Sequence, residues 1–243
     1  MASRSRSVPY DATLACRTLA ASDPKLARLI ERAGPYTLRL KPTASPLEAL
    51  LESIVYQQLN GRAAQTIHGR VLALFGAQHP TPEALLRLPD AALRGAGLSA
   101  NKLAAVRDLG EKARSGVVPT LAHLRKLDDA EIVEHLTQVR GIGVWTVEML
   151  LLFRLGRPNV LPVGDYGVRK GYALTFLGLD PDARVQPADL PTAEILRKRA
   201  ARWQPWCSVA SWYLWRACDL AAQAKPLKKQ SAATAQRITK RRP

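Results

Sequence analysis

Residues 136–155 read LTQVRGIGVWTVEMLLLFRL. Two stretches with the three- and four-residue apolar spacing of helices flank the tripeptide Gly141-Ile142-Gly143. A turn this tight needs backbone freedom on both sides of one apolar residue, which glycine supplies. The second helix would then begin with exposed amides that no bulky side chain covers, and such amides bind phosphate groups without reading base sequence. A corner between two helices of any helical protein is the alternative interpretation.

The same helical spacing continues on both sides of this segment. Ala, Leu and Arg dominate the chain, Ser45 and Ser99 stand where N-caps are expected, and Gly76 stands where a helix would stop. Alternation typical of a strand occurs only in YTLRL at residues 36–40. We therefore expect an all-α protein of short helices with no substantial β domain.

Net charge is the strongest global signal in the sequence. Lys and Arg number 36 and acidic residues 20, so the formal charge is +16. Leaving out residues 1–7 and 225–243 leaves +7 on residues 8–224, so the body of the chain is basic as well. A polyanionic partner, most simply nucleic acid, is the leading interpretation, and a basic proteome or a solubility tail is the alternative. Segment 225–243 is polar and basic, and we expect it to be disordered.

Composition excludes several other classes of protein. The three cysteines are scattered and form no CxxC pair, which argues against a disulfide framework, a zinc ribbon or an iron–sulfur cluster. No apolar run approaches the roughly 18 residues of a membrane helix, and the N-terminus lacks the apolar core of a secretory signal. We expect a cytoplasmic protein without a membrane partner.

Downstream of the glycine turn, Asp165 lies in a loop just before another helical run. It belongs to one of five segments that stand in a specific order along most of the chain. They are IVYQQLNGRAA at 54–64, GLSANK at 97–102, VRGIGVWTVEMLL at 139–151, PVGDYGVRKG at 162–171 and WQPWCSVASWYLW at 203–215. In these segments the sequence resembles the helix-hairpin-helix (HhH-GPD) DNA glycosylase superfamily, and most of all its 3-methyladenine DNA glycosylase II (AlkA-like) branch.

The resemblance implies that Asp165 is the catalytic carboxylate, and that Gly141, Ile142 and Gly143 form the hairpin that grips the DNA backbone. Breaking an N-glycosidic bond builds positive charge on the sugar, which a nearby carboxylate stabilises. A base alkylated on a ring nitrogen is already cationic, so its departure needs little acid catalysis. The alternative role for Asp165 is the N-cap of the helix that follows, and the two roles are compatible.

Four side chains are expected around the base that is removed: Trp145, Met149, Trp206 and Tyr166. Family members that also cut the DNA backbone carry a lysine at the position of Trp145, so the tryptophan implies hydrolysis without lyase activity. The family often has an aromatic residue at the position of Met149, and an adaptable methionine there predicts a wider substrate range. Trp206 would attract a cationic base through its indole face. Core packing is expected for the other tryptophans of this region, Trp203, Trp212 and Trp215.

A base taken out of the stack leaves a gap, which such enzymes fill with a wedge side chain. The resemblance leaves Gln58 and Leu59 as candidates for the wedge, and a buried capping role for Leu59 is the alternative. Lys102, near a helix start, and Arg169 are candidates for phosphate contacts, with plain solvation as the alternative.

Three main-chain carbonyls match family positions that hold a monovalent cation, those of Thr137, Val139 and Ile142. The resemblance implies a structural Na⁺ or K⁺ ion there, and a water molecule is the alternative. The implied reaction requires no cofactor.

We expect two helical domains that flank a DNA-binding cleft. Residues 46–157 would form a helical barrel with the hairpin, and residues 1–45 with 158–224 would form the second domain, which carries Asp165. The implied function is that of a nucleoid-associated monomer that excises alkylated bases, chiefly 3-methyladenine and 7-methylguanine, from double-stranded DNA in base excision repair. Two alternatives stay open: a non-catalytic DNA-binding protein that uses the hairpin alone, and a glycosylase for another lesion.

Overall fold

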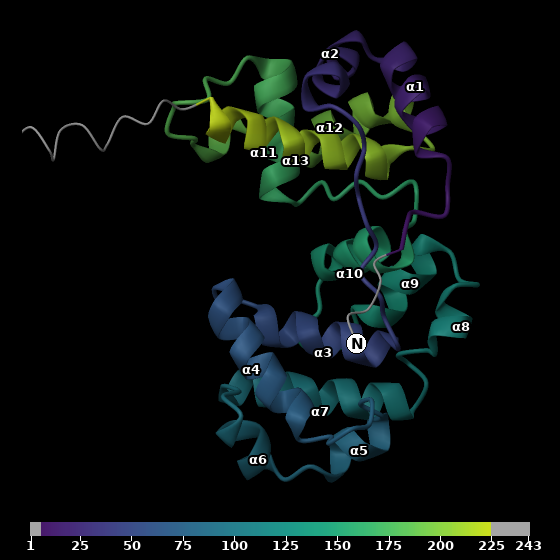
Figure 1. The fold of residues 1–243 in the computed structure, drawn as a ribbon, viewed down its shortest axis with the longest axis vertical. Helices are drawn as coiled ribbons and strands as arrows, with labels where there is room; N and C mark the ends of the chain where they lie inside the picture. Colours follow the sequence, from purple (N-terminus) through teal and green to yellow (C-terminus); the bar gives the residue numbers. More distant parts are fainter. Residues whose placement is uncertain (1–5, 225–243) are drawn as a thin grey trace, which may run out of the picture. The chain divides into compact units, whose positions relative to one another are not determined.

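The computed structural model describes residues 6–224. In this range the regular elements are helices (Figure 1). The one β pairing among these residues is an isolated antiparallel bridge between Arg6 and Leu40. The all-α fold class is therefore confirmed, and the strand-like residues 36–40 make only this single bridge. None of the helices between residues 6 and 224 is long and apolar enough to cross a membrane. Segment 225–243 lies outside the described residues.

The chain divides into two compact units. Unit 1 contains residues 6–9 and 39–157, and unit 2 contains residues 10–38 and 158–224. This division differs from the expected one near the N-terminus, where residues 6–9 and 39–45 lie in unit 1. Arg6 and Leu40 exchange backbone hydrogen bonds of 3.2 and 2.8 Å, and the Lys41 amide donates to the Phe153 carbonyl at 2.9 Å. These backbone contacts hold both short segments to unit 1.

Unit 1 is built from short helices that begin and end at local sequence signals. They are α3 (Pro46–Tyr56), α4 (Gly61–Ala73), α5 (Pro82–Arg87), α6 (Asp90–Gly95), α7 (Ala100–Arg114), α8 (Leu121–Leu124), α9 (Asp129–Leu136) and α10 (Val144–Leu150), which continues as the π-helical turn η1 (Leu151–Leu155). Ser45 and Ser99 cap α3 and α7 as predicted, accepting from the Glu48 and Lys102 amides at 3.1 and 3.3 Å. α3 packs against α4 and α7, and α9 packs against α10.

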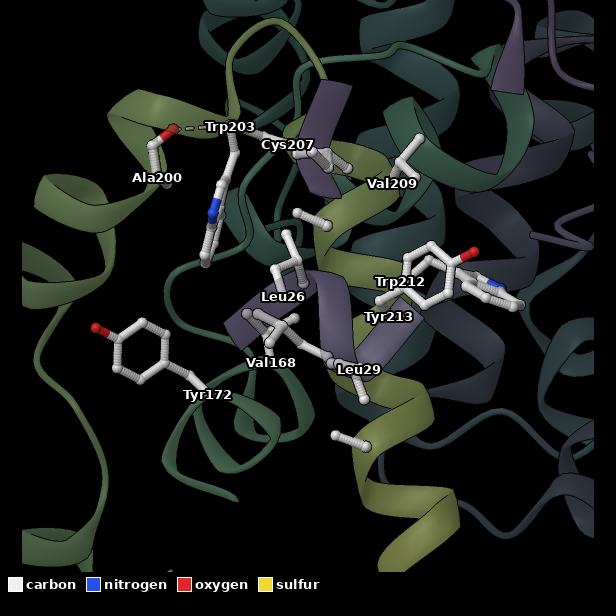
Figure 2. Packing of buried hydrophobic residues seen from close by; sticks show 14 of the residues in the cluster. Leu26, Leu29, Val168, Tyr172, Ala200, Trp203, Cys207, Val209, Trp212 and Tyr213 are labelled. Carbon is white, nitrogen blue, oxygen red and sulfur yellow. Dashed lines mark hydrogen bonds between the residues drawn. The ribbon is translucent and has the colours of Figure 1, made fainter. Parts of the chain in front are cut away.

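Unit 2 is organised around its longest helix. Its elements are α1 (Ala12–Ser22), α2 (Pro24–Ala33), α11 (Tyr166–Tyr172), the π-helical turn η2 (Ala173–Leu177), the 3₁₀ turn η3 (Pro187–Asp189), α12 (Ala193–Ala200), the 3₁₀ turn η4 (Ala201–Trp203) and α13 (Cys207–Gln223). α1, α2 and α11 all pack against α13. Figure 2 shows Leu26 and Leu29 of α2 and Val168 of α11 beside that helix, and these residues belong to one hydrophobic core. A Cβ at Gly171 would overlap the Leu214 carbonyl, so this glycine permits the close packing of α11 on α13.

One buried carboxylate holds several elements of unit 2 together. Asp23 is 0% exposed and accepts from Nε and Nη2 of Arg199, both at 2.8 Å, and from Nε1 of Trp203 at 3.1 Å. Burial by itself raises the pKa of this carboxyl, but the hydrogen bonds from Arg199 and Trp203 outweigh burial, so the pKa lies below its usual value. Asp23 is therefore charged and paired inside the unit.

Candidate functional site

The residues expected at the site from the sequence are divided between the units. Unit 1 holds the hairpin, α10 and the turn with both wedge candidates. Unit 2 holds Asp165, Tyr166 and Trp206. The site residues of unit 1 are described first, followed by those of unit 2.

The hairpin between α9 and α10 takes its shape from two glycines in different conformations. Gly141 lies in the left-handed region with φ +79°, whereas Gly143 has φ −101° and is the N-cap residue of α10. Ile142 between them is buried, and its amide donates to the Val139 carbonyl at 3.0 Å. No side chain caps α10, and a Cβ at Gly143 would meet no atom within 4 Å. A phosphate group can therefore approach the start of α10 closely.

The first turn of α10 presents an apolar surface next to the hairpin. Trp145 is 50% exposed and its neighbour Val144 is 52% exposed. Met149 follows Trp145 by four residues, so the two side chains share one face of the helix, and Met149 is half-buried. These two side chains leave apolar surface exposed beside the hairpin.

The turn between α3 and α4 exposes both wedge candidates. Gln58 is the one non-glycine residue among residues 6–224 with a positive φ, +57°, and Leu59 is 38% exposed. The α4 helix is capped by Asn60, which accepts from the Ala63 amide at 2.9 Å. Leu59 is therefore not a buried capping residue, and it stays a candidate for the wedge together with Gln58.

Both cations expected at phosphates have carbonyl partners inside their own unit. In unit 1, Nζ of Lys102 donates to the Val55 carbonyl near the end of α3 at 2.6 Å, and burial lowers the pKa of this lysine. In unit 2, Nε of Arg169 donates to the Pro191 carbonyl at 3.0 Å. Each side chain thus has a structural contact that local sequence did not suggest.

The carbonyls of Thr137, Val139 and Ile142 lie at the end of α9 and in the hairpin. Carbonyl oxygens are the ligands that K⁺ and Na⁺ take in proteins, so the chemistry of this donor set fits a monovalent cation. The Val139 carbonyl accepts the Ile142 amide and keeps a second lone pair for an ion.

In unit 2, Asp165 is the N-cap residue of α11 and two donors hold it. Its Oδ1 accepts the Val168 amide at 2.8 Å, which is the capping bond, and also accepts the indole Nε1–H of Trp215 at 2.8 Å. The carboxylate is half-buried. The capping role that the sequence left as an alternative is therefore confirmed, and the second donor comes from a different helix, α13.

Trp215 packs against the core, as expected, and it has a second role that the sequence did not indicate. This side chain packs against the hydrophobic core of unit 2, but its Nε1 contacts Asp165. Gly167 permits the contact, because a Cβ there would lie 2.6 Å from Cδ1 of Trp215 and 3.1 Å from Oδ1 of Asp165. A glycine two residues after the carboxylate is the one sequence signal that accompanies this arrangement.

Two aromatic residues of the expected pocket, Tyr166 and Trp206, also belong to unit 2. Tyr166 follows Asp165 directly and is 58% exposed. Trp206 is half-buried at the start of α13, and its ring lies 5.7 Å from that of Tyr10 at 47°. Trp203 and Trp212 are buried, as predicted.

Comparison with known proteins relates this geometry to one family. The family described as "HhH-GPD superfamily base excision DNA repair protein" matches residues 51–187. The chain is 34% identical over 212 residues to DNA-3-methyladenine glycosylase 1 of Schizosaccharomyces pombe, across 86% of this chain and 89% of that protein.

Two solved structures resemble most of the chain. A DNA-3-methyladenine glycosidase from Bacillus halodurans has a TM-score of 0.76 and 35% identity, with 91% of this chain and 95% of that chain covered. A 3-methyladenine DNA glycosylase from Schizosaccharomyces pombe, in complex with abasic DNA, has a TM-score of 0.71 and 32% identity, with 84% and 95% covered.

Proposed function

The chain belongs to the HhH-GPD superfamily of base excision DNA repair proteins, within its 3-methyladenine DNA glycosylase branch, and we propose that it hydrolyses the N-glycosidic bond of alkylated bases in double-stranded DNA. The expected substrates are 3-methyladenine and 7-methylguanine. The Asp165 carboxylate carries the proposal, because two donors from α11 and α13 orient one of its oxygens. A cap alone needs only the Val168 amide.

Asp165 acts on the sugar. As the bond between C1′ and the base nitrogen breaks, its electron pair goes to the base and positive charge develops on the sugar, next to the carboxylate. A carboxylate whose orientation is fixed before the reaction stabilises that charge without reorganising. Water then bonds to C1′ and releases a proton, and the products are an abasic site and the free base.

A base methylated on a ring nitrogen carries a positive charge, and the departing electron pair neutralises it. No second acid is therefore required. Trp145, Met149, Tyr166 and Trp206 are the side chains that we propose surround the base, where indole faces attract a cationic ring more strongly than a neutral one. The resemblance aligns Trp145 with the lysine of family members that cut the backbone. We therefore expect no Schiff base between protein and sugar, and sodium borohydride should trap no covalent adduct with DNA.

Unit 1 supplies the grip on DNA in this proposal. Gly141, Ile142 and Gly143 present backbone amides to a phosphate, and Gln58 or Leu59 fills the gap left by the extruded nucleotide. A Na⁺ or K⁺ ion on the hairpin carbonyls would add positive charge beside that phosphate. We further propose that the protein works as a monomer on chromosomal DNA in the cytoplasm, and that Lys102 and Arg169 add positive potential near the phosphates.

Single-turnover release of bases from methylated duplex DNA tests the reaction. Asp165→Asn keeps an N-cap side chain and removes the charge, so α11 should still form while the rate falls by about 10²-fold or more. Asp11→Asn is the matched control, since Asp11 caps α1 in the same unit by accepting the Thr13 and Leu14 amides. Its rate should equal that of the wild type.

The released bases, separated by chromatography, identify the substrates. If the wild type binds DNA tightly but releases no alkylated base, the proposal fails. The non-catalytic DNA-binding protein would then be the better interpretation, unless other lesions are processed. Equal rates for the wild type and Asp165→Asn would remove the carboxylate from the mechanism.

A further inference from the structure

Two elements of unit 1 that the proposed function places on DNA are joined by one side chain. Nε2 of Gln57 donates to the Gly141 carbonyl at 2.8 Å, across 84 residues of sequence. Gln57 is the C-cap residue of α3 and directly precedes Gln58 and Leu59, whereas Gly141 is the first glycine of the hairpin. The bond therefore runs from the wedge turn, residues 57–60, to the hairpin.

The backbone turns sharply beside both ends of this bond. Gln58 has φ +57° and Gly141 has φ +79°, so each element turns through the left-handed region next to the bond. Strained non-glycine conformations persist where the surrounding structure holds them, and they cluster at functional sites. The Gln57 amide is a neighbour that can hold both turns at once.

Helix α7 contacts both the end of α3, which precedes the wedge turn, and the residue that precedes the hairpin. Lys102 donates to the Val55 carbonyl just before the wedge turn, at 2.6 Å, and Oδ2 of Asp108 accepts the Arg140 amide just before the hairpin, at 2.7 Å. Ala105 lies between them in sequence, and its Cβ would be 3.8 Å from a Cβ at Gly141. These three α7 residues follow one another at three-residue spacing and therefore lie along one side of the helix.

Lys102 and Asp108 of α7 hold the residues that precede the wedge turn and the hairpin. The Gln57 bond then fixes the distance between the wedge turn and the hairpin themselves. We propose that Gln57 is a positioning residue, which keeps the wedge turn in register with the hairpin so that gripping the backbone and filling the gap occur together. This inference rests on the proposed function. Its consequence is specific: losing the bond should hinder extrusion of a base more than binding of DNA or cleavage of the glycosidic bond.

Two substitutions remove the bond in different ways. Gln57→Met keeps the length of the side chain and removes the donor, and Gln57→Glu places an acceptor against the Gly141 carbonyl. Gln65→Glu is the control for charge, because Gln65 is exposed on α4 in the same unit. Thermal unfolding of each variant establishes that it is folded, and Gln57→Met keeps the test informative if Gln57→Glu is unstable.

The substrates differ only in the cost of extrusion. A duplex oligonucleotide carries one 7-methylguanine, either opposite cytosine or opposite a tetrahydrofuran abasic analogue that leaves it unpaired. Both Gln57 variants should lose about tenfold or more in single-turnover rate on the paired lesion, because small misplacements of positioning groups are costly. On the unpaired lesion they should stay within about threefold of the wild type, since extrusion there is less demanding. Equal loss on both substrates, or no loss on either, overturns the proposal.

A second readout needs no catalysis. A duplex with a tetrahydrofuran site next to 2-aminopurine reports unstacking by the wedge as a rise in fluorescence. The wild type and Gln65→Glu should give this rise, and Gln57→Met should bind the duplex with little rise. A normal rise with Gln57→Met, or none with the wild type, overturns the inference. A rise without any base release from alkylated DNA would instead count against the proposed function alone.

Discussion

Trp215 of α13 donates its indole N–H to Oδ1 of Asp165 at 2.8 Å, and the Val168 amide donates to the same oxygen from within α11. The orientation of the carboxylate thus depends on how α11 and α13 pack, as well as on the cap of α11. Gly167 and Gly171 keep α11 close enough to α13 for this contact. The packing of unit 2 and the chemistry proposed for Asp165 are connected through these positions.

Trp215→Phe should lower the rate of base release while the protein stays folded. The substitution keeps a smaller aromatic ring against the core and removes the N–H donor to Asp165. A hydrogen bond to a charged group contributes about 1.5–3 kcal/mol, which corresponds to a loss of about 10- to 100-fold in single-turnover rate if the bond acts fully in the transition state. Trp212→Phe, on the same helix, is the control and should change stability but not the rate per folded molecule.

Gly167→Ala should disturb the same contact from the other side. The added Cβ would lie 2.6 Å from Cδ1 and 2.8 Å from Nε1 of Trp215, so the indole or α11 must move. We expect a rate loss similar to that of Trp215→Phe, and the double variant should lose little more than either single one, because both act on one contact. Gly164→Ala places its Cβ in open space and should retain the wild-type rate. Additive losses in the double variant would contradict this interpretation.

Gly143→Ala should weaken DNA binding while leaving the free energy of unfolding almost unchanged. Its φ of −101° is accessible to alanine and its Cβ would meet nothing within 4 Å, so the free energy of unfolding should change by less than about 0.5 kcal/mol. The methyl group would stand where a phosphate approaches, and the Kd for undamaged duplex DNA should rise, measurably by fluorescence anisotropy. Gly141→Ala should lose about 1–2 kcal/mol of stability, because alanine is strained at φ +79°. Unchanged DNA affinity of Gly143→Ala would argue against backbone recognition by the hairpin.

Asp23→Ala should destabilise unit 2 by about 3 kcal/mol in denaturant unfolding, because it leaves Arg199 without its partner. Asp11→Ala, at an exposed cap, should cost about 1 kcal/mol of stability.

The pH dependence of stability tests the charge of Asp23. Because the pKa of Asp23 is lower in the folded than in the unfolded protein, its charge contributes stability above the unfolded pKa, and this contribution is lost as pH falls through the folded pKa. The stability gap between the wild type and Asp23→Asn should therefore narrow below about pH 4. A gap that widens with acid would contradict a charged, paired Asp23.

DNA affinity should fall steeply with salt. The formal charge is +16, and phosphate contacts release counterions when they form. Several contacts would give a slope of log affinity against log salt steeper than about −3, measured on undamaged duplex. A flat response would be incompatible with recognition through the phosphate backbone.

The local features of this protein could be predicted from its amino-acid sequence. Helical spacing predicted the all-α class, and Ser45 and Ser99 cap the helices that they were expected to cap. The Gly141-Ile142-Gly143 turn and Asp165 at a helix start were also visible, because turns and caps depend on residues that are neighbours along the chain.

The contacts between residues far apart in the sequence depend on how the helices pack. The bond of Trp215 to Asp165 spans 50 residues, that of Gln57 to Gly141 spans 84, and that of Lys102 to Val55 spans 47. Nothing in the spacing of these residues marks them as partners, since each contact depends on how elements distant in sequence pack. Gly167 permits the first of these contacts. Trp215, which was expected only to pack in the core, therefore also belongs to the candidate site, because its indole N–H reaches Asp165.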